Sequence, residues 1–220
     1  MRTKLGLIHT SATLVPIFQE LVTRYLGDKD IEIFNIVDDS LIKNTIKQNK
    51  LTPDTARRVS DYIGSAEQAG ADFIMVTCSS IGPAVEASEL LTSIPVLRVD
   101  RPMADKAVKI GTKIGVIATL ETTLEPTSDL VSRRAKAVGK DIEIFSVCCQ
   151  GAFEALMGGD AAIHDQIVAE ALKGLSDKVD VILLAQASMA RVVDQLGASD
   201  KRVPILASPP IAMEYLAEIL

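Results

Sequence analysis

Short apolar runs alternate along this chain with longer amphipathic segments. Runs such as "DFIMV" at 72–76 are almost continuously apolar, which is typical of strands buried on both faces of a parallel sheet. Residues 52–70 and 159–178 have helical periodicity instead. Thr52 and Pro53 form a typical helix start, and Gly70 a typical helix end. The pattern therefore predicts an α/β protein.

Four blocks of the first half recur in the second half in the same order. Their offsets are 109, 111, 108 and 109 residues. The pairs are "KLGLIHT" (4–10) with "KIGVIAT" (113–119), "IEIF" (31–34) with the same letters at 142–145, "DFIMVTCSS" (72–80) with "DVILLAQAS" (180–188), and "IPVL" (94–97) with "VPIL" (203–206). Buried strands resemble one another, but a shared order and spacing indicate an internal duplication.

The duplication predicts two pseudo-symmetric lobes, each with a four-stranded, mostly parallel sheet flanked by helices. We expect residues 1–100 and a C-terminal helix at about 208–220 to form the first lobe, and residues 101–207 the second. Ligands of open parallel sheets bind beyond the carboxyl ends of the strands. We therefore expect an active site in a cleft between the lobes, built from the duplicated strand ends.

Polar residues follow the third strand of each half at matching positions. Cys78 and Gln186 each lie six residues after an aspartate, and Ser80 and Ser188 follow two positions later. A lone cysteine is often a core residue. A place at a strand end beside Thr77 and Ser79 favours a displayed thiol instead, since a polar group buried there without a partner costs free energy.

Hydroxyl-rich turns follow the first strand of each half, in "HTSATLVP" at 9–16 and "TLETTLEP" at 119–126. Hydroxyls and free backbone amides at a strand-to-helix turn suit a carboxylate. The alternative is that these residues only cap helices and form turns. The candidate carboxylate ligands are Thr10, Ser11, Thr119, Thr122 and Thr123.

Composition excludes several classes of protein. The net charge is −6 with dispersed Lys and Arg, which argues against a nucleic-acid partner. No apolar run approaches the roughly 18 residues of a membrane span, and the N-terminus is typical of a strand rather than a signal peptide. Three cysteines fit a reducing cytosol, so we expect a cytoplasmic protein. Two histidines without metal-ligand spacing predict no metal site.

The duplicated halves, the "VTCSS" stretch and the "TLETTLEPT" turn resemble the aspartate/glutamate racemase superfamily, particularly its hydantoin-racemase-like branch. The resemblance covers nearly the whole chain. It implies an isomerase without a cofactor, in which one cysteine of each lobe moves a proton at the carbon alpha to a carboxylate. The expected substrates are an amino acid, a hydantoin, or a substituted malonate or related diacid. Members often form dimers, and the sequence leaves a homodimer or a higher homo-oligomer open.

Carried onto this chain, the first family cysteine falls on Cys78, and the second falls on Gln186. An amide has no accessible pKa near neutrality, so Gln186 serves as neither general acid nor base, although it can hydrogen-bond a carboxylate. One-sided decarboxylase or lyase chemistry is therefore an alternative to racemisation. Arylmalonate decarboxylase likewise retains one cysteine, that of the second lobe. A non-catalytic protein that binds small carboxylates is the further alternative.

His9 follows the first strand, where glutamate-racemase-like members commonly carry an acidic residue. A His9–Cys78 pair would lower the pKa of the thiol, and the alternative is a structural histidine. We interpret Cys148 and Cys149 as buried thiols rather than a disulfide or redox pair. His164, in the middle of a predicted helix, is expected to be a surface residue.

Overall fold

A computed structural model describes residues 2–197 and 200–220 of the chain. The chain divides into two compact units, Met1–Val99 with Pro209–Leu220 and Asp100–Ser208, which we call the first and second lobe. Each lobe contains one sheet of four parallel strands. Helices flank both sheets, so the predicted α/β class is confirmed.

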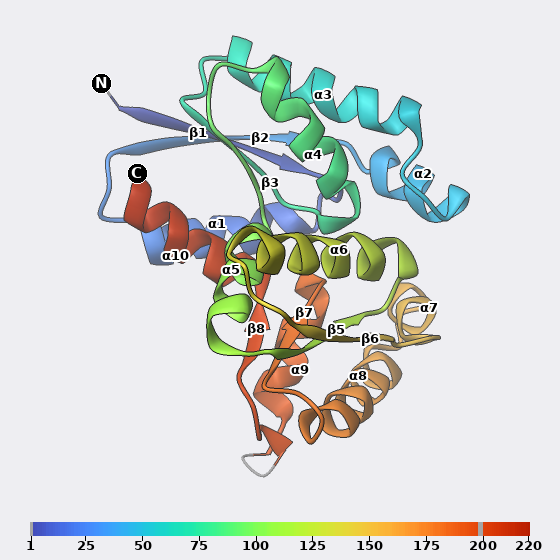
Figure 1. The fold of residues 1–220 in the computed structure, drawn as a ribbon. Helices are drawn as coiled ribbons and strands as arrows, with labels where there is room; N and C mark the ends of the chain where they lie inside the picture. Colours follow the sequence, from blue (N-terminus) through green and yellow to red (C-terminus); the bar gives the residue numbers. More distant parts are fainter. Residues whose placement is uncertain (1, 198–199) are drawn as a thin grey trace. The chain divides into compact units, whose positions relative to one another are not determined.

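The sheet of the first lobe has the strand order β2-β1-β3-β4. The strands are β1 (Thr3–His9), β2 (Ile31–Val37), β3 (Phe73–Val76) and β4 (Val96–Arg98). Figure 1 shows α3 (Pro53–Gln68) and α4 (Gly82–Ser88) on one face, and α1 (Leu14–Leu26) and α10 (Ser208–Ile219) on the other. The helix α2 (Ser40–Gln48) follows β2 and places Leu41 in the core beneath α3.

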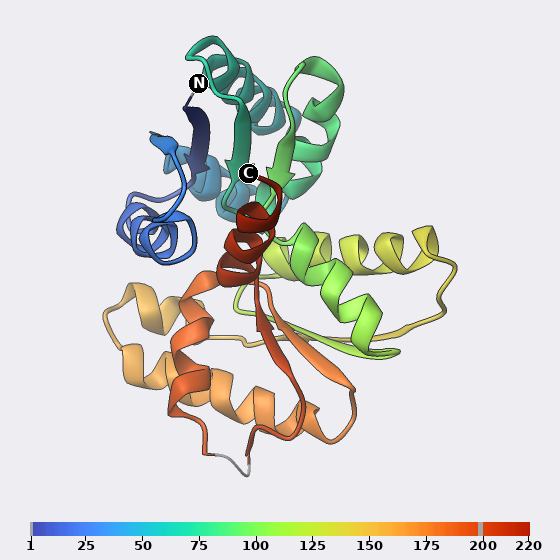
Figure 2. The ribbon, with the colours of Figure 1, turned by 90° about the vertical axis from the view of Figure 1, so that its left-hand side faces the viewer.

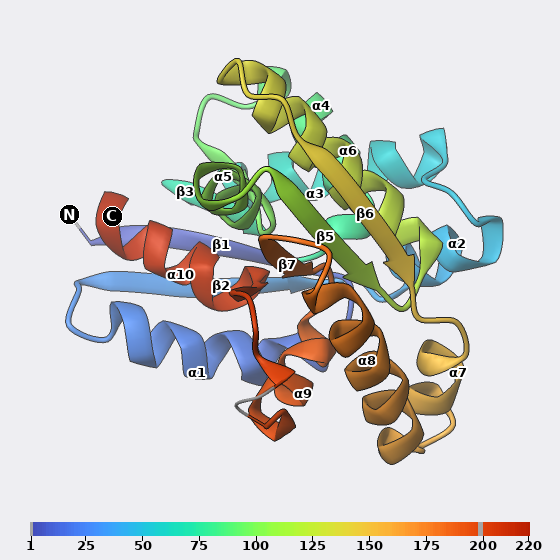
Figure 3. The ribbon, with the colours of Figure 1, turned by 60° about the horizontal axis from the view of Figure 1, so that its bottom comes forward.

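The sheet of the second lobe has the equivalent order β6-β5-β7-β8. The strands are β5 (Lys113–Ala118), β6 (Glu143–Cys148), β7 (Val181–Leu184) and β8 (Ile205–Ala207). One face is covered by α5 (Arg101–Ile110) and α6 (Glu121–Ala137), seen in green and yellow in Figure 2. The other face is covered by α7 (Ala152–Met157), α8 (Ala161–Ser176) and α9 (Ala190–Gln195), as Figure 3 shows.

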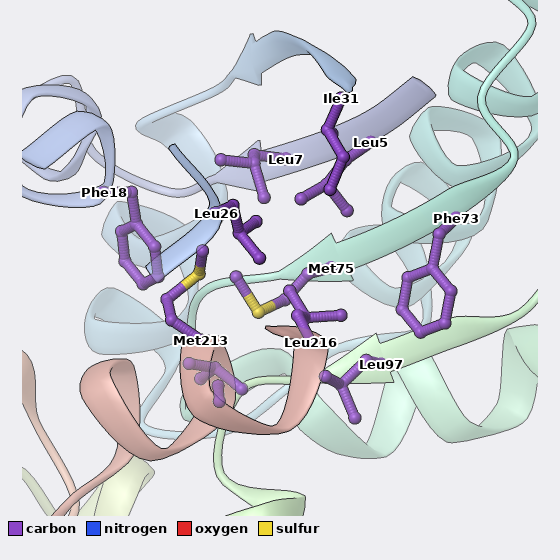
Figure 4. Close-up of a cluster of buried hydrophobic side chains, with 12 residues drawn as sticks. Leu5, Leu7, Phe18, Leu26, Ile31, Phe73, Met75, Leu97, Met213 and Leu216 are labelled. Atoms are coloured by element: carbon purple, nitrogen blue, oxygen red, sulfur yellow. The ribbon is translucent and has the colours of Figure 1, made fainter. Parts of the chain in front are cut away.

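Both faces of the first sheet are buried, which explains its nearly continuous apolar strands. On the face of α1 and α10, the sheet residues Leu5 and Met75 pack against Phe18 and Met213 (Figure 4). On the opposite face, Ile8 and other side chains pack beneath α3 and α4. The helix α10 is thus part of the core of the first lobe, although it ends the chain.

A matching aspartate fixes the register of β1 with β3 and of β5 with β7. The backbone amide of Lys4 donates to Asp72 over 2.8 Å, and that of Lys113 donates to Asp180 over 2.8 Å. In return, the amides of both aspartates donate to the carbonyls of these lysines. The register of two paired strands decides which of their residues lie side by side at the carboxyl ends. These contacts therefore also determine which residues meet beyond the strands.

The helices predicted from periodicity are present as α3 and α8. The Thr52 hydroxyl accepts a hydrogen bond from the Thr55 amide over 3.3 Å, and Pro53 is the first helical residue. Gly70, two residues after the end of α3, has a φ of 86°, a conformation that favours glycine. The start and end signals of this helix are therefore confirmed.

The predicted surface position of His164 is wrong, because this side chain is fully buried. His164 lies on the same face of α8 as the buried Val168, Leu172 and Leu175, at helical spacings. Its Nδ1 atom lies 2.7 Å from Asp165 Oδ1, which in turn accepts from Arg191 of α9. The helix therefore buries a wider face than its hydrophobic residues alone indicate.

A glycine occupies the middle of the central strand in each sheet. A Cβ atom on Gly115 of β5 would lie 2.5 Å from Leu175 Cδ2, and one on Gly6 of β1 would lie 3.1 Å from Phe34 Cζ. The close approach of α8 to the second sheet therefore depends on the missing side chain of Gly115.

We expect Gly115→Ala to lower the free energy of unfolding of the protein by about 1–3 kcal/mol, because the added methyl group overpacks the space held by Leu175. Gly174→Ala in α8 is the matched control. A Cβ there meets nothing within 4 Å, and the change should stabilise the helix by about 0.5–1 kcal/mol. Urea denaturation of both variants checks the pair, and equal stabilities would contradict the packing argument.

Candidate functional site

Parallel pairing brings Thr10 and Cys78 to the same edge of the first sheet. Ile8 of β1 pairs with Val76 of β3, and the Thr77 amide donates to the Ile8 carbonyl over 3.0 Å. Two residues after this pair, the Thr10 hydroxyl interacts with the Cys78 side chain. The first lobe thus holds a hydroxyl–thiol pair directly beyond the carboxyl ends of its central strands.

Cys78 stands at the start of the short 3₁₀ helix η1 (Ser79–Ile81), which leads into α4. The residue keeps some exposure, but burial of its side chain raises the pKa of the thiol above its ordinary value. The Thr10 hydroxyl, together with hydrogen bonds from Ser80 and the Ile81 amide, acts in the opposite direction. These donors favour the thiolate, because each hydrogen-bonds the charged form of the sulfur.

The second lobe repeats this arrangement with an amide in place of the thiol. Ile117 of β5 pairs with Leu184 of β7, which brings Thr119 next to Gln186. The Gln186 Oε1 atom accepts from the Thr119 amide over 2.5 Å and from the Thr119 hydroxyl over 2.8 Å. Thr119–Gln186 is therefore the counterpart of Thr10–Cys78.

Two polar groups near this second strand end have no protein partner among the described residues. The Gln186 carbonyl is occupied by Thr119, but no hydrogen bond is found for its Nε2 amino group. The Thr122 hydroxyl, in the first turn of α6, is buried and has none either. An unsatisfied buried hydroxyl costs free energy, so these groups suit an acceptor supplied by a ligand.

His9 does not hydrogen-bond Cys78. Its Nδ1 atom lies 2.9 Å from the Thr77 hydroxyl, and its Nε2 atom lies 2.9 Å from Asn35 Oδ1. The ring is fully buried and also packs against Phe18, with the ring centroids 5.5 Å apart. Burial lowers the pKa of His9, although the Asn35 hydrogen bond opposes it. His9 is therefore a neutral residue that holds Thr77, the neighbour of Cys78.

The remaining candidates have simpler surroundings. The Ser11 hydroxyl lies 2.7 Å from that of Thr13 in the turn after β1. The side chains of Ser79, Ser80 and Thr123 are buried. Ser188 lies in the 3₁₀ helix η3 (Ala187–Met189), which matches η1 of the first lobe. These residues belong to the same strand ends, and their role as ligands of a substrate stays a prediction.

Sequence reasoning missed a polar cluster at the end of β2. Asp38 accepts hydrogen bonds from Tyr62 over 2.7 Å, from Ser40 over 2.7 Å and from Arg58. These interactions lower the pKa of Asp38, although burial opposes them. Asn35 was missed as well. Its only signal in the sequence is a polar residue within the apolar stretch "IEIFNIV".

The cysteine pair lies at the end of β6. Cys149 is a core residue that packs with Ala152 and Val168, and its amide donates to the Ala118 carbonyl. Burial raises the pKa of Cys149 to about 11. Burial together with the charge of Glu121 raises the pKa of Cys148 to about 12. Both groups are therefore protonated thiols near neutrality, and neither forms a disulfide.

Within the described residues, no group of three His, Cys, Asp or Glu side chains is arranged to bind a metal ion. In the same part of the chain, no helix has both the length and the apolar character needed to span a bilayer.

Solved structures of similar fold cover almost the whole chain. A glutamate racemase from Bacillus anthracis matches with a TM-score of 0.73 and 20% identity, over 99% of this chain and 81% of that one. An aspartate racemase from Picrophilus torridus matches with a TM-score of 0.71 and 14% identity, over 98% and 94%. An allantoin racemase from Klebsiella pneumoniae has a TM-score of 0.67 and 16% identity, over 99% and 87%. At these identities the likeness shows the fold.

A curated glutamate racemase from Streptococcus gordonii is 27% identical over 140 residues. The match spans 60% of this chain and 52%, or about half, of the length of that relative. The family model described as Asp/Glu/hydantoin racemase matches residues 4–216, which include both strand ends. The chain therefore belongs to the Asp/Glu/hydantoin racemase family.

Proposed function

We propose that this protein transfers a proton at the carbon alpha to the carboxylate of a small acid, without a cofactor. The observation that carries the proposal is the repeated pair at the strand ends, Thr10–Cys78 in the first lobe and Thr119–Gln186 in the second. The names of the relatives support a small acid or a hydantoin-like compound as substrate, since they act on glutamate, aspartate and allantoin.

Cys78 is the residue that carries the proton in this proposal. Its thiolate removes the proton from the alpha carbon, the electron pair passes into the adjacent carbonyl group, and the resulting thiol returns a proton to the same carbon. The hydrogen bonds from Thr10, Ser80 and Ile81 support the charged sulfur during this cycle. His9 takes part indirectly, because it fixes the Thr77 side chain next to the thiol.

Gln186 serves as a ligand of the substrate in this proposal. Its Oε1 atom is held by Thr119, which leaves the Nε2 donors for a ligand. These donors and the unpartnered Thr122 hydroxyl suit a carboxylate or carbonyl oxygen. An amide cannot deliver a second proton, so proton exchange on one face of the substrate is expected to outpace inversion.

Replacement of the thiol tests the role of Cys78. In deuterated buffer, we expect the wild type to incorporate deuterium at the alpha carbon of a member of a panel of aspartate, glutamate and 5-methylhydantoin. Cys78→Ser should lower this exchange by at least about 100-fold, because loss of a positioned acid–base group typically costs about 10²–10⁴-fold. Cys149→Ala is the matched control, since its thiol is a core residue. Proton NMR measures the exchange, and undiminished exchange in Cys78→Ser would disprove the assignment.

Gln186→Glu tests the substrate contact with a nearly isosteric change. The new carboxylate can still accept from Thr119, but it loses the Nε2 donors and repels an anionic substrate. We expect KM for the exchanged substrate to rise about 10- to 100-fold, as for the loss of a hydrogen bond to a charged group. A change in kcat with an unaltered KM would instead place Gln186 away from the bound carboxylate.

The pH dependence of exchange follows from the raised pKa of Cys78. Because the thiolate is the active form, the rate should rise with pH into the alkaline range, about tenfold for each pH unit below the pKa of the thiol. Initial rates measured across neutral and alkaline pH check this profile. A rate that already levels off below neutrality would show that another group limits the reaction.

Decarboxylation by a single thiol is a second candidate, and Gln186 at the place of the second family cysteine favours it. In that reaction carbon dioxide leaves the substrate, and the Cys78 thiol protonates the remaining carbanion. Release of carbon dioxide from methylmalonate or phenylmalonate would identify this activity. Binding of the same acids by calorimetry, without exchange or release, would instead indicate a non-catalytic binding protein.

A further inference from the structure

Arg98 is a buried cation in the first lobe. It is the last residue of β4, its side chain is fully buried, and its Nη1 atom lies 3.0 Å from Glu86 Oε2 of α4. Taking an ion pair out of water costs several kcal/mol per ion, and well-packed apolar residues often replace such pairs without loss of stability. A contribution to folding is therefore a weak explanation for an arginine at this position.

The guanidinium of Arg98 lies against Gly82, the first residue of α4. A Cβ atom on Gly82 would lie 2.3 Å from Arg98 Cζ and 2.4 Å from Nη2. The backbone of Gly82 has φ −52° and ψ −41°, which every residue type adopts without strain. The glycine is therefore required by the close approach of the guanidinium and not by its own conformation.

Gly82 connects this cation to the turn that carries Cys78. Its amide donates to the Ser79 carbonyl and so closes η1. The amides of Ser80 and Ile81, in the same turn, act on the sulfur of Cys78. The sequence "CSSIG" thus runs from the thiol to the residue against which the guanidinium packs.

We propose that Arg98 is a positioning residue that fixes the turn at Ser79–Gly82 and thereby sets the reactivity of the Cys78 thiol. The planar guanidinium fills the space left by the missing side chain of Gly82, and Glu86 holds it from the next turn of α4. With the turn fixed, the amides of Ser80 and Ile81 stay directed at the sulfur. A catalytic benefit of Arg98 rests on the proposed function of Cys78. The effect of Arg98 on the reactivity of the thiol does not depend on that function.

Few charged groups surround the thiol, so its rate of alkylation reports on the Arg98 side chain and the turn beside it. On the β1 side lie Thr10 and the neutral His9, which holds Thr77. The helix α2 places the uncharged Leu41 and Thr45 on its buried face. From α4 and β4 comes the Glu86–Arg98 pair. Arg98→Lys keeps the charge but not the planar contact with Gly82, so it separates an effect through the turn from the loss of the positive charge.

The experiment compares alkylation of Cys78 by iodoacetamide, followed by mass spectrometry of the peptide that contains it, across pH. We expect Arg98→Met to slow alkylation near neutrality by about tenfold, which corresponds to a rise of about one unit in the pKa of the thiol. Arg98→Lys should recover part of the rate, because the ammonium keeps the charge but not the planar contact. Gly82→Ala should resemble Arg98→Met, since its methyl group displaces the guanidinium.

Gly64→Ala is the matched control, because a Cβ on this residue of α3 meets nothing within 4 Å. Its pH profile should equal that of the wild type. The proposal is overturned if Arg98→Met or Arg98→Lys folds and shows the wild-type profile, or if Gly82→Ala alone does so. No substrate enters the assay, so a shifted profile in a protein without exchange activity would refute only the proposed function.

Discussion

The parallel pairing of β1 with β3 and of β5 with β7 is the constraint on which the candidate site depends. Parallel strands end at the same edge of a sheet, so the residues just beyond two paired strands meet there. This pairing brings Thr10 to Cys78 and Thr119 to Gln186. Asp72 and Asp180 fix the register at the opposite end of the strands. The strand pairs that hold each sheet together therefore also position the residues of the candidate site.

The reactivity of Cys78 is a balance between two effects of the same location. Burial beneath the sheet edge disfavours the thiolate, whereas the hydroxyl of Thr10 and the amides of the following turn favour it. Neither effect comes from a neighbouring imidazole, because His9 is engaged with Thr77 and Asn35. In our proposal, the pKa of the Cys78 thiol therefore depends on the geometry of the turn at Ser79–Gly82. Arg98 fixes this geometry through its contact with Gly82.

Periodicity and repetition in the sequence were enough to predict the strands and the matching positions of Cys78 and Gln186. The strand order, and with it the place of Thr10 beside Cys78, came from the structure, where the sequence had suggested His9 as the partner of the thiol. Contacts between segments without a repeated pattern were not predictable, such as Arg98 against Gly82 or His9 with Asn35. His164 was predicted at the surface, whereas its spacing of four and eight residues from Val168 and Leu172 places it on the buried face of α8. The hydrogen bond between its Nδ1 atom and Asp165 offsets part of the cost of burying the ring, whereas its buried Nε2 atom has no partner among the described residues. No sequence pattern reveals the contact with Asp165.

One backbone frame thus holds two different chemistries. In the first lobe, the threonine hydroxyl acts on a sulfur that can gain and lose a proton. In the second lobe, the amide of Gln186 has no accessible pKa near neutrality, and its Oε1 atom accepts from both the backbone amide and the hydroxyl of Thr119, which orients the side chain as a donor. The two strand ends therefore differ in more than the titratable group, because Gln186 also engages the backbone amide of Thr119. For this reason we propose proton transfer at the first strand end and substrate binding at the second.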